Sequence, residues 1–284
     1  QANASFFVRS TKNLFLMWNH EYVGKNYNAV NGFVARKGIY RLEPMAGYTF
    51  FPKVDALQSI NTELYMDFYT DLEFKRLDDL RRASTTFRFL NTSELYFEGV
   101  SNYTRLRGDF DPTFNDNSNV TYFEGQDFQT YNFGIGFWSS IINKFRYKLN
   151  LDYGQYYDGT KTGTRVELIY RIQPYANFTL LVNNNFVSLP GFEDVNLTRI
   201  GPKVEFTITN KLFLNYYLQF NSINDNLANN FRIQWRFKPL SDIYLVYSDN
   251  YGASSDFEGG NYNIDINQTK NRAIVFKMVY WLNL

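Results

Sequence analysis

The 284-residue sequence contains no cysteine and a single histidine, His20, and these shortages exclude several kinds of site. Without cysteine the chain forms no disulfide, no thiolate metal site and no cysteine nucleophile. One histidine excludes the usual histidine-rich zinc and iron sites. The 29 Lys and Arg residues are balanced by 28 Asp and Glu residues, so no basic excess indicates a nucleic-acid partner.

The sequence also lacks a run of the ~18–20 apolar residues that a membrane-spanning helix requires. Its mean hydropathy of −0.40 is that of a soluble protein. Aromatic residues, in contrast, are abundant, with 28 Phe, 23 Tyr and 4 Trp making up 19% of the chain. Because a soluble domain rarely has an interior large enough for so many rings, the composition alone does not settle the fold class.

The clearest pattern is alternation of apolar and polar residues over segments of about ten positions. In residues 145–153, Phe, Tyr and Leu share one side, while the other side carries Arg146, Lys148, Asn150 and Asp152. Residues 231–238 repeat this pattern. A helix would scatter the apolar side chains around its axis, so the period of two predicts β-strands.

A soluble β-sandwich also alternates, but globular strands average ~5–6 residues, whereas a tilted strand that crosses a bilayer needs ~9–11. We therefore predict one all-β domain, residues 1–284: an antiparallel transmembrane outer-membrane β-barrel with about 14 strands in this chain. The expected strands are 13–23, 39–51, 60–74, 82–91, 93–105, 123–138, 144–157, 161–173, 175–187, 197–209, 211–222, 230–238, 242–250 and 271–284.

The predicted connections alternate between short turns and longer Asn-, Asp- and Gly-rich loops, as outer-membrane barrels require. Residues 106–122 and 251–270 are the longest of these predicted loops. Gln1–Arg9 alternates as well, and residues 10–13 look like one more short turn. We therefore expect either that the chain is the C-terminal part of a larger barrel, or that its first strand pairs unusually.

The last predicted strand ends in a row of aromatic and aliphatic side chains on one face. Such an ending resembles the signal read by the barrel-assembly machinery, which makes that machinery an expected partner. The residues of this signal are Phe276, Met278, Tyr280, Leu282 and Leu284.

Several runs together resemble the C-terminal barrel of a family of Bacteroidota outer-membrane proteins whose function is not established. The runs are Gly32–Arg36, Tyr40–Pro44, Tyr48–Lys53, Tyr157–Thr162, Tyr170–Pro174, Phe231–Tyr247 and Asn271–Lys277. The resemblance covers about Gly32 to Leu284 and implies an upstream periplasmic module similar to family-nine carbohydrate-binding domains. The sequence departs from the family by lacking that upstream part and by having Ala35 where proline is expected.

The polar sides of the predicted strands carry charge unevenly, which predicts an acidic wall opposite a basic one in the lumen. One interpretation is a transverse field that selects charged solutes; the other is that these side chains pair with one another and fill the lumen. The acidic wall comprises Asp67, Asp71, Glu73, Glu94 and Glu98. The basic wall comprises Arg146, Lys148, Arg165, Arg171, Arg199, Lys203, Arg232, Arg236, Lys238 and Lys277.

Three weaker patterns could indicate a functional site, but each also has an ordinary structural explanation. His20 is the one candidate catalytic base, but its neighbour Glu21 falls on the opposite side of a strand, so the two form no dyad. Residues 109–111 and 115–117 supply oxygen ligands without the Gly and closing Glu of an EF-hand loop. The charged run Lys75–Arg82 is interpreted as a solvated outer loop that contacts anionic lipopolysaccharide.

These observations favour a non-enzymatic protein of the outer membrane without catalytic residues, cofactor or metal. The first hypothesis is a scaffold or accessory subunit of an envelope assembly that handles glycans or proteins. The alternative is a passive or gated channel for polar solutes. The expected partners are outer-membrane lipid and lipopolysaccharide, the barrel-assembly machinery and other outer-membrane proteins in a complex, with no nucleic acid.

Overall fold

The computed structural model describes residues 2–28, 34, 36–112, 121–223, 226–256 and 261–282. These residues form one antiparallel sheet of fifteen strands that follow one another in chain order. The strands are β1 Ala2–Ser10, β2 Leu14–Val23, β3 Ile39–Phe50, β4 Leu57–Asp71, β5 Arg76–Phe89, β6 Glu94–Arg105, β7 Asp127–Trp138, β8 Phe145–Tyr156, β9 Gly159–Ile172, β10 Ala176–Ser188, β11 Val195–Thr207, β12 Leu212–Asn221, β13 Asn226–Lys238, β14 Ser241–Asp256 and β15 Asn261–Val279.

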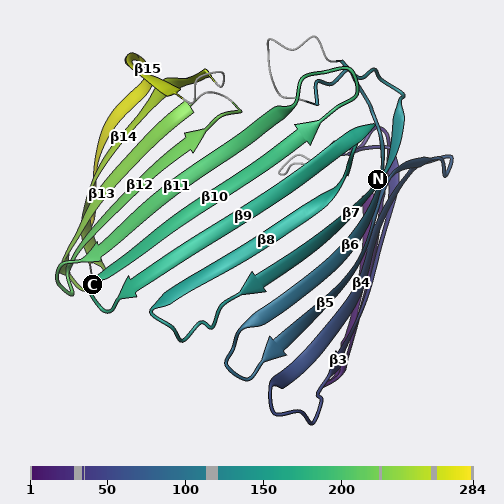
Figure 1. Ribbon diagram of the computed structural model, residues 1–284, viewed down its shortest axis with the longest axis horizontal. Coiled ribbons are helices and arrows are strands. Elements are labelled where there is room, and N and C mark those ends of the chain that lie inside the picture. Colours follow the sequence, from purple (N-terminus) through teal and green to yellow (C-terminus); the bar gives the residue numbers. More distant parts are fainter. Residues whose placement is uncertain are drawn as a thin grey trace.

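Every strand pairs with its sequence neighbour, which makes the sheet an up-and-down meander (Figure 1). The sheet is strongly curved, so that β3–β5 and β13–β15 turn away from the strands between them. Within the described residues, β1 pairs with β2 alone and β15 with β14 alone. Because the strand direction alternates and the number of strands is odd, β1 and β15 run in the same direction, and direct antiparallel pairing between them is excluded.

The cross-strand register gives the sheet two chemically different faces. Across β7 and β8, Phe133 lies opposite Tyr153 and Ile135 opposite Leu151. One residue away on the same strands, Gly134 lies opposite Asp152 on the other face. Since successive side chains point to opposite sides of a strand, the alternation collects the rings and aliphatic chains on what we name the apolar face. The charged residues collect on what we name the polar face.

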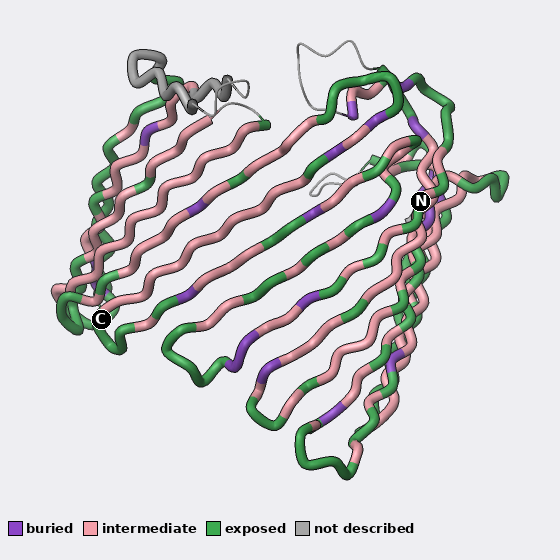
Figure 2. The backbone as a smooth tube through the Cα atoms, viewed as in Figure 1, coloured by how far each residue is buried: buried purple, intermediate pink, exposed green. Residues whose placement is uncertain are grey.

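The apolar face is covered by no layer of the described chain. Phe133 is 69% exposed and Tyr153 57% exposed, and few residues on any strand are fully buried (Figure 2). The accessible surface is 18525 Å², whereas a compact soluble monomer of this mass has about 12,700 Å². The hydrophobic residues therefore do not form an interior core in the way those of a soluble domain do.

The two ends of the sheet differ in their connections. At the end that includes the last residues of β15, which we name the turn side, connections have at most six residues (51–56 and 139–144). The opposite end, the loop side, carries the two longest connections, 24–38 and 106–126, although the β8–β9 turn there has two residues. In outer-membrane barrels the longer loops lie outside the cell.

The predicted all-β antiparallel barrel-type fold is confirmed, and most predicted strands match within a few residues. The alternating start of the chain does form a strand, β1, so the sheet has fifteen strands rather than fourteen. Among the described residues, no helix is long and apolar enough to cross a membrane.

Three predictions about segments are wrong. Arg76–Arg82 belong to β5 and are not an outer loop, because all of them except Leu77, which lies at a register shift, pair with β4 or β6. Residues 251–256 and 261–270 belong to the extended hairpin of β14 and β15 and are not a loop. The last strand ends at Val279 rather than at residue 284, and the Trp281 amide donates to the Ser241 hydroxyl (3.0 Å).

Two glycines provide a test of the register between neighbouring strands. A Cβ on Gly154 would lie 2.3 Å from the carbonyl oxygen of Tyr131, whereas a Cβ on Gly99 would meet nothing closer than Phe133 at 3.8 Å. We expect Gly154→Ala to lower the free energy of unfolding by about 1–3 kcal/mol through overpacking. Gly99→Ala, the control, changes it by less than ~1 kcal/mol. Denaturant midpoints would measure both, and equal midpoints would contradict the close approach of β7 and β8.

Candidate functional site

The polar face is the candidate site, because its charged groups converge from many strands. Asp67, Glu94 and Glu98 all lie on this face. Asp71 also lies on it, but one of its oxygens accepts the amides of Glu73 and Lys75 (2.9 and 2.8 Å), which fixes the β4–β5 turn. Glu73 belongs to that turn and to no strand, so its assignment to the acidic wall is wrong.

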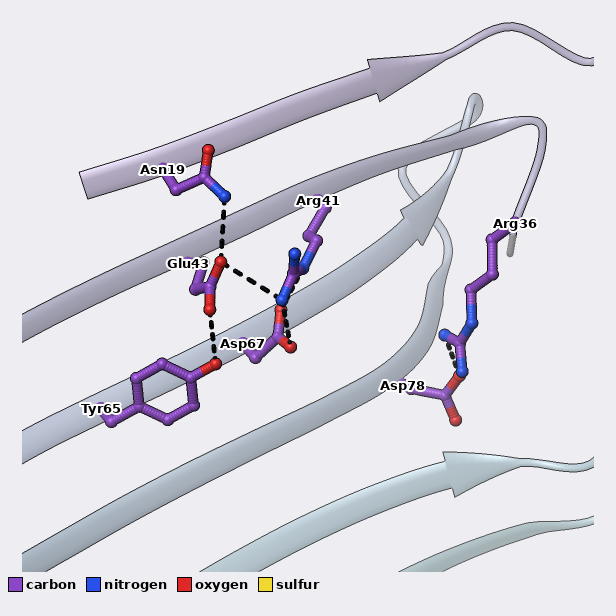
Figure 3. A network of polar contacts seen from close by, with 7 residues as sticks. All are labelled: Asn19, Arg36, Arg41, Glu43, Tyr65, Asp67 and Asp78. Carbon is purple, nitrogen blue, oxygen red and sulfur yellow. Dashed lines mark hydrogen bonds and ion pairs between the residues drawn. The ribbon is translucent and has the colours of Figure 1, made fainter. Parts of the chain in front are cut away.

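The acidic side of the polar face is an ion-paired network rather than a purely acidic surface (Figure 3). Arg41 contacts Asp67 through two hydrogen bonds (2.8 and 2.9 Å) and Glu43 at 3.2 Å. Glu43 also accepts hydrogen bonds from Asn19 (2.9 Å) and Tyr65 (2.6 Å). These contacts satisfy both carboxylates and stiffen β2, β3 and β4 against one another.

A second ion pair lies toward the loop side of the same network (Figure 3). Asp78 on β5 binds Arg36 at 2.6 Å and Arg107 at 3.6 Å. Arg36 comes from connection 24–38 and Arg107 from connection 106–126, the two longest connections of the chain. One carboxylate thus joins both loops to the wall of the sheet.

The basic side of the polar face contains all but one of the predicted residues. Lys148 is paired with Glu167 (3.1 Å), Lys203 with Glu205 (2.7 Å) and Arg236 with Asp242 (3.3 Å). Lys238 is the exception: it ends β13 after a register shift, and its ammonium donates to Tyr280 (3.3 Å) at the turn side. The other members on this face are Arg146, Arg165, Arg171, Arg199, Arg232 and Lys277.

The register also builds a row that contains nothing but arginine and asparagine. It crosses β8 to β13 and consists of Asn150, Arg165, Asn183, Arg199, Asn221 and Asn226. Within the part of the chain that the structure describes, Arg165 and Arg199 form no ion pair. They flank Asn183 on adjacent strands, so two uncompensated guanidinium groups and several amides are available to an anionic or hydroxyl-rich solute.

A cavity of about 380 Å³ opens on the polar face near the turn side. Arg171, Asn177, Glu205 and Gln234 line it together with the ring of Phe213. The Nε of Arg171 and the Oδ1 of Asn177 are buried and have no partner among the described residues. Unsatisfied groups of this kind are costly and usually find a partner, so this cavity offers an unused donor and an unused acceptor on the basic side.

Aromatic rings anchor connection 106–126 at the loop side of the polar face. Tyr122 lies 5.2 Å from Phe128 and 5.3 Å from Tyr157, measured between ring centroids. Its hydroxyl donates to Asp158, and the Tyr156 hydroxyl donates to the carbonyl of Pro112 (3.0 Å). Burial and the Asp158 contact raise the pKa of Tyr122 above its usual value. These contacts therefore hold connection 106–126 against the loop-side end of the polar face.

The remaining candidate residues are placed as follows. His20 lies on the apolar face opposite Leu42, while Glu21 lies on the polar face opposite Arg41, so they form no dyad. One carboxylate oxygen of Asp109 accepts the amide of Glu124 (3.1 Å), and residues 115–117 lie outside the described residues. No group of three possible metal ligands occurs in the described ranges.

The C-terminal row of apolar residues is divided in the structure. Phe276 and Met278 are on the apolar face of β15, opposite Leu245 and Ile243. Tyr280 and Leu282 follow the end of the strand, and Tyr280 stacks on Phe237 with 6.3 Å between ring centroids. Leu284 lies outside the described residues.

Sequence reasoning missed several members of the network on β2–β4, including Arg41 and Glu43. Arg41 and Asp67 are 26 positions apart, and nothing in the alternation shows which residues of two strands lie opposite each other. Alternation assigned Asp67 to the polar side of its strand and gave no assignment for Arg41. The missing signal was the register.

We expect loss of the Arg41 guanidinium to destabilise the fold, because Asp67 and Glu43 would lose their shared cation. Arg41 and Asp67 are 23% and 16% exposed, so Arg41→Met should cost about 1–3 kcal/mol, less than a fully buried pair. Arg88→Met, the control, removes an exposed partner of Glu94 and should cost less than ~1 kcal/mol. A double-mutant cycle with Asp67→Asn measures the coupling, and additive effects would contradict the pairing.

We expect Tyr122→Phe to loosen connection 106–126, because the hydroxyl that binds Asp158 is removed while the ring packing remains. In the wild type the anchor persists through neutral pH and is lost only as pH rises through the raised pKa of Tyr122. Limited proteolysis within 106–126 measures this, with Tyr131→Phe on the apolar face as the control. Equal cleavage of Tyr122→Phe and wild type would show that the hydroxyl does not hold the loop.

Comparison with known proteins gives little further information. No protein-family description and no curated protein matches the chain. Among solved structures, the siderophore receptor PirA from Acinetobacter baumannii matches with a TM-score of 0.44 and 7% identity. The match covers 94% of this chain and 55% of the receptor, so the chain spans about half of the receptor's length. Similarity at this level says nothing about what this chain binds.

Proposed function

We propose that the chain forms part of the wall of a transmembrane β-barrel in a Gram-negative outer membrane. It acts without catalysis, as a scaffold or accessory subunit of an envelope assembly. The observation that carries the proposal is the two-faced sheet. Its exposed aromatic and aliphatic face matches the surface that contacts lipid, and its ion-paired face matches a lumen. An outward face of this kind in water would be an aggregation hazard.

Three features support a role within an assembly. Among the described residues β1 pairs with β2 alone and β15 with β14 alone, so each edge of the sheet is open to pairing with a further strand. The ion pairs and connection 106–126 fill part of the polar face with the chain's own side chains. The predicted resemblance to a Bacteroidota family with a carbohydrate-binding module is compatible with a glycan-handling complex, and it remains a prediction.

A channel for polar solutes is the second candidate, favoured by one observation. Arg165 and Arg199 face the lumen side without ion-pair partners in the described structure, and such groups lower the barrier for anions. Planar-bilayer recordings separate the candidates: a channel conducts alone, whereas a subunit stays silent and co-purifies with other outer-membrane proteins in mild detergent. A stable conductance that falls when both arginines are changed to glutamine would overturn the subunit proposal.

The membrane placement is tested by neighbouring substitutions on β10. Leu180 lies on the apolar face opposite Leu168 and Pro202, and Thr179 lies on the polar face opposite Lys203. Leu180→Arg should destabilise the protein in lipid vesicles by about 2–4 kcal/mol, since it places a charge against lipid. Thr179→Arg, the control, should have a smaller effect. Unfolding in vesicles measures both, and equal losses would contradict a lipid-facing apolar surface.

A further inference from the structure

A groove with a charged end crosses the apolar face over β4 to β8. It consists of two cavities of about 530 and 230 Å³ that share Ala83, Gly99 and Phe133. Ala83 and Gly99 lie opposite each other on β5 and β6, and their small size lowers the floor between larger neighbours. The large apolar side chains that line it are Leu64, Met66, Phe97, Tyr131, Ile135, Leu151 and Tyr153, and the small polar ones on the same face are Thr62, Thr85 and Ser101.

Two arginines of β5 lie on the loop side of Ala83, at one end of the groove. Arg81 lines the smaller cavity, and its Nε lies 3.4 Å from Asp79. Arg76 also pairs with Asp79 and lies over the ring of Tyr103, 3.7 Å from its centroid. Asp79 is buried while the side chains of Arg81 and Arg76 are 52% and 42% exposed, so the cluster presents a surplus positive charge outward.

The depth of this cluster in the membrane matters, because placing a charged side chain on a lipid-facing surface lowers the stability of the folded protein. An arginine costs about 2–4 kcal/mol at the bilayer midplane and about 0–1 near the interface. Arg76 begins β5 at its loop-side end, and Arg81 lies five residues further along the strand, still on the loop side of Ala83. With the loop side placed outside the cell, the two arginines are at the end of the groove that is nearer the outer headgroups.

We propose that this groove binds one lipopolysaccharide molecule of the outer leaflet. An acyl chain lies along Ala83, Gly99 and Phe133, and a lipid phosphate binds Arg76 and Arg81. Guanidinium groups bind phosphate through paired, charge-assisted hydrogen bonds. The groove supplies an apolar surface that extends from the arginines toward the turn side, the direction in which an acyl chain of an outer-leaflet lipid would run. The inference rests on the proposed membrane placement and adds a specific lipid partner to it.

The test uses protein purified in mild detergent from membranes of a lipopolysaccharide-producing host. We expect lipopolysaccharide to co-purify, and the double variant Arg76→Gln/Arg81→Gln to bind added lipopolysaccharide about tenfold more weakly. Gly99→Leu should also weaken binding, since its Cβ is accommodated while the rest of the side chain fills the groove. Arg272→Gln is the matched control, because Arg272 lies on the apolar face opposite Asp249, far along the sheet.

Further measurements identify the ligand and distinguish a failure of the lipopolysaccharide proposal from a failure of the proposed membrane placement. Dephosphorylated lipopolysaccharide, phosphatidylglycerol and inorganic phosphate are compared by the shift in melting temperature that each produces. Equal binding of phosphatidylglycerol, or of inorganic phosphate alone, would overturn the assignment to lipopolysaccharide. Unchanged affinity in both the arginine and the Gly99→Leu variants would overturn the site itself. Failure of the protein to insert into vesicles would instead contradict the membrane placement, which the substitutions on β10 test independently.

Discussion

The structure depends on the antiparallel hydrogen-bond ladder, because each strand satisfies its backbone groups through its neighbours and its register decides which residues share a face. A shift of one residue would move the side chains of a strand's apolar face to the polar face and those of its polar face to the apolar face. Register is therefore fixed jointly by both faces, by ring contacts on one and by ion pairs such as Lys148–Glu167 on the other. In a bilayer the same ladder also replaces water as the partner of the backbone.

The sequence predicts this fold well because period-two alternation is a local property. Residues 145–153 can be assigned to two sides of a strand without knowing what lies next to them. Charged runs mislead for the same reason: residues 75–82 look solvated, yet Arg81 lies opposite Met66 and Ser101 within the sheet. A local pattern cannot distinguish a loop from a strand that carries charge at the border of an apolar belt.

The candidate site was predictable only in part. The side of the strand was correct for nearly all of the predicted wall residues, whereas their partners were not available from the sequence. Arg41 reduces the contribution of Asp67 to the electrostatic potential of the polar face, because a carboxylate bound to a guanidinium carries little net charge. The cavity near Arg171 and the groove over Gly99 also depend on three or more strands at once, and such arrangements exist only once the register is known.

The distribution of pairing across the polar face bears on where a solute would bind. On β3 to β5, Asp67 and Glu43 are paired with Arg41, and Asp78 with Arg36, and breaking those contacts would leave partly buried carboxylates without a cation. On β9 and β11, Arg165 and Arg199 have no such partner among the described residues, so binding an anion there costs no existing ion pair.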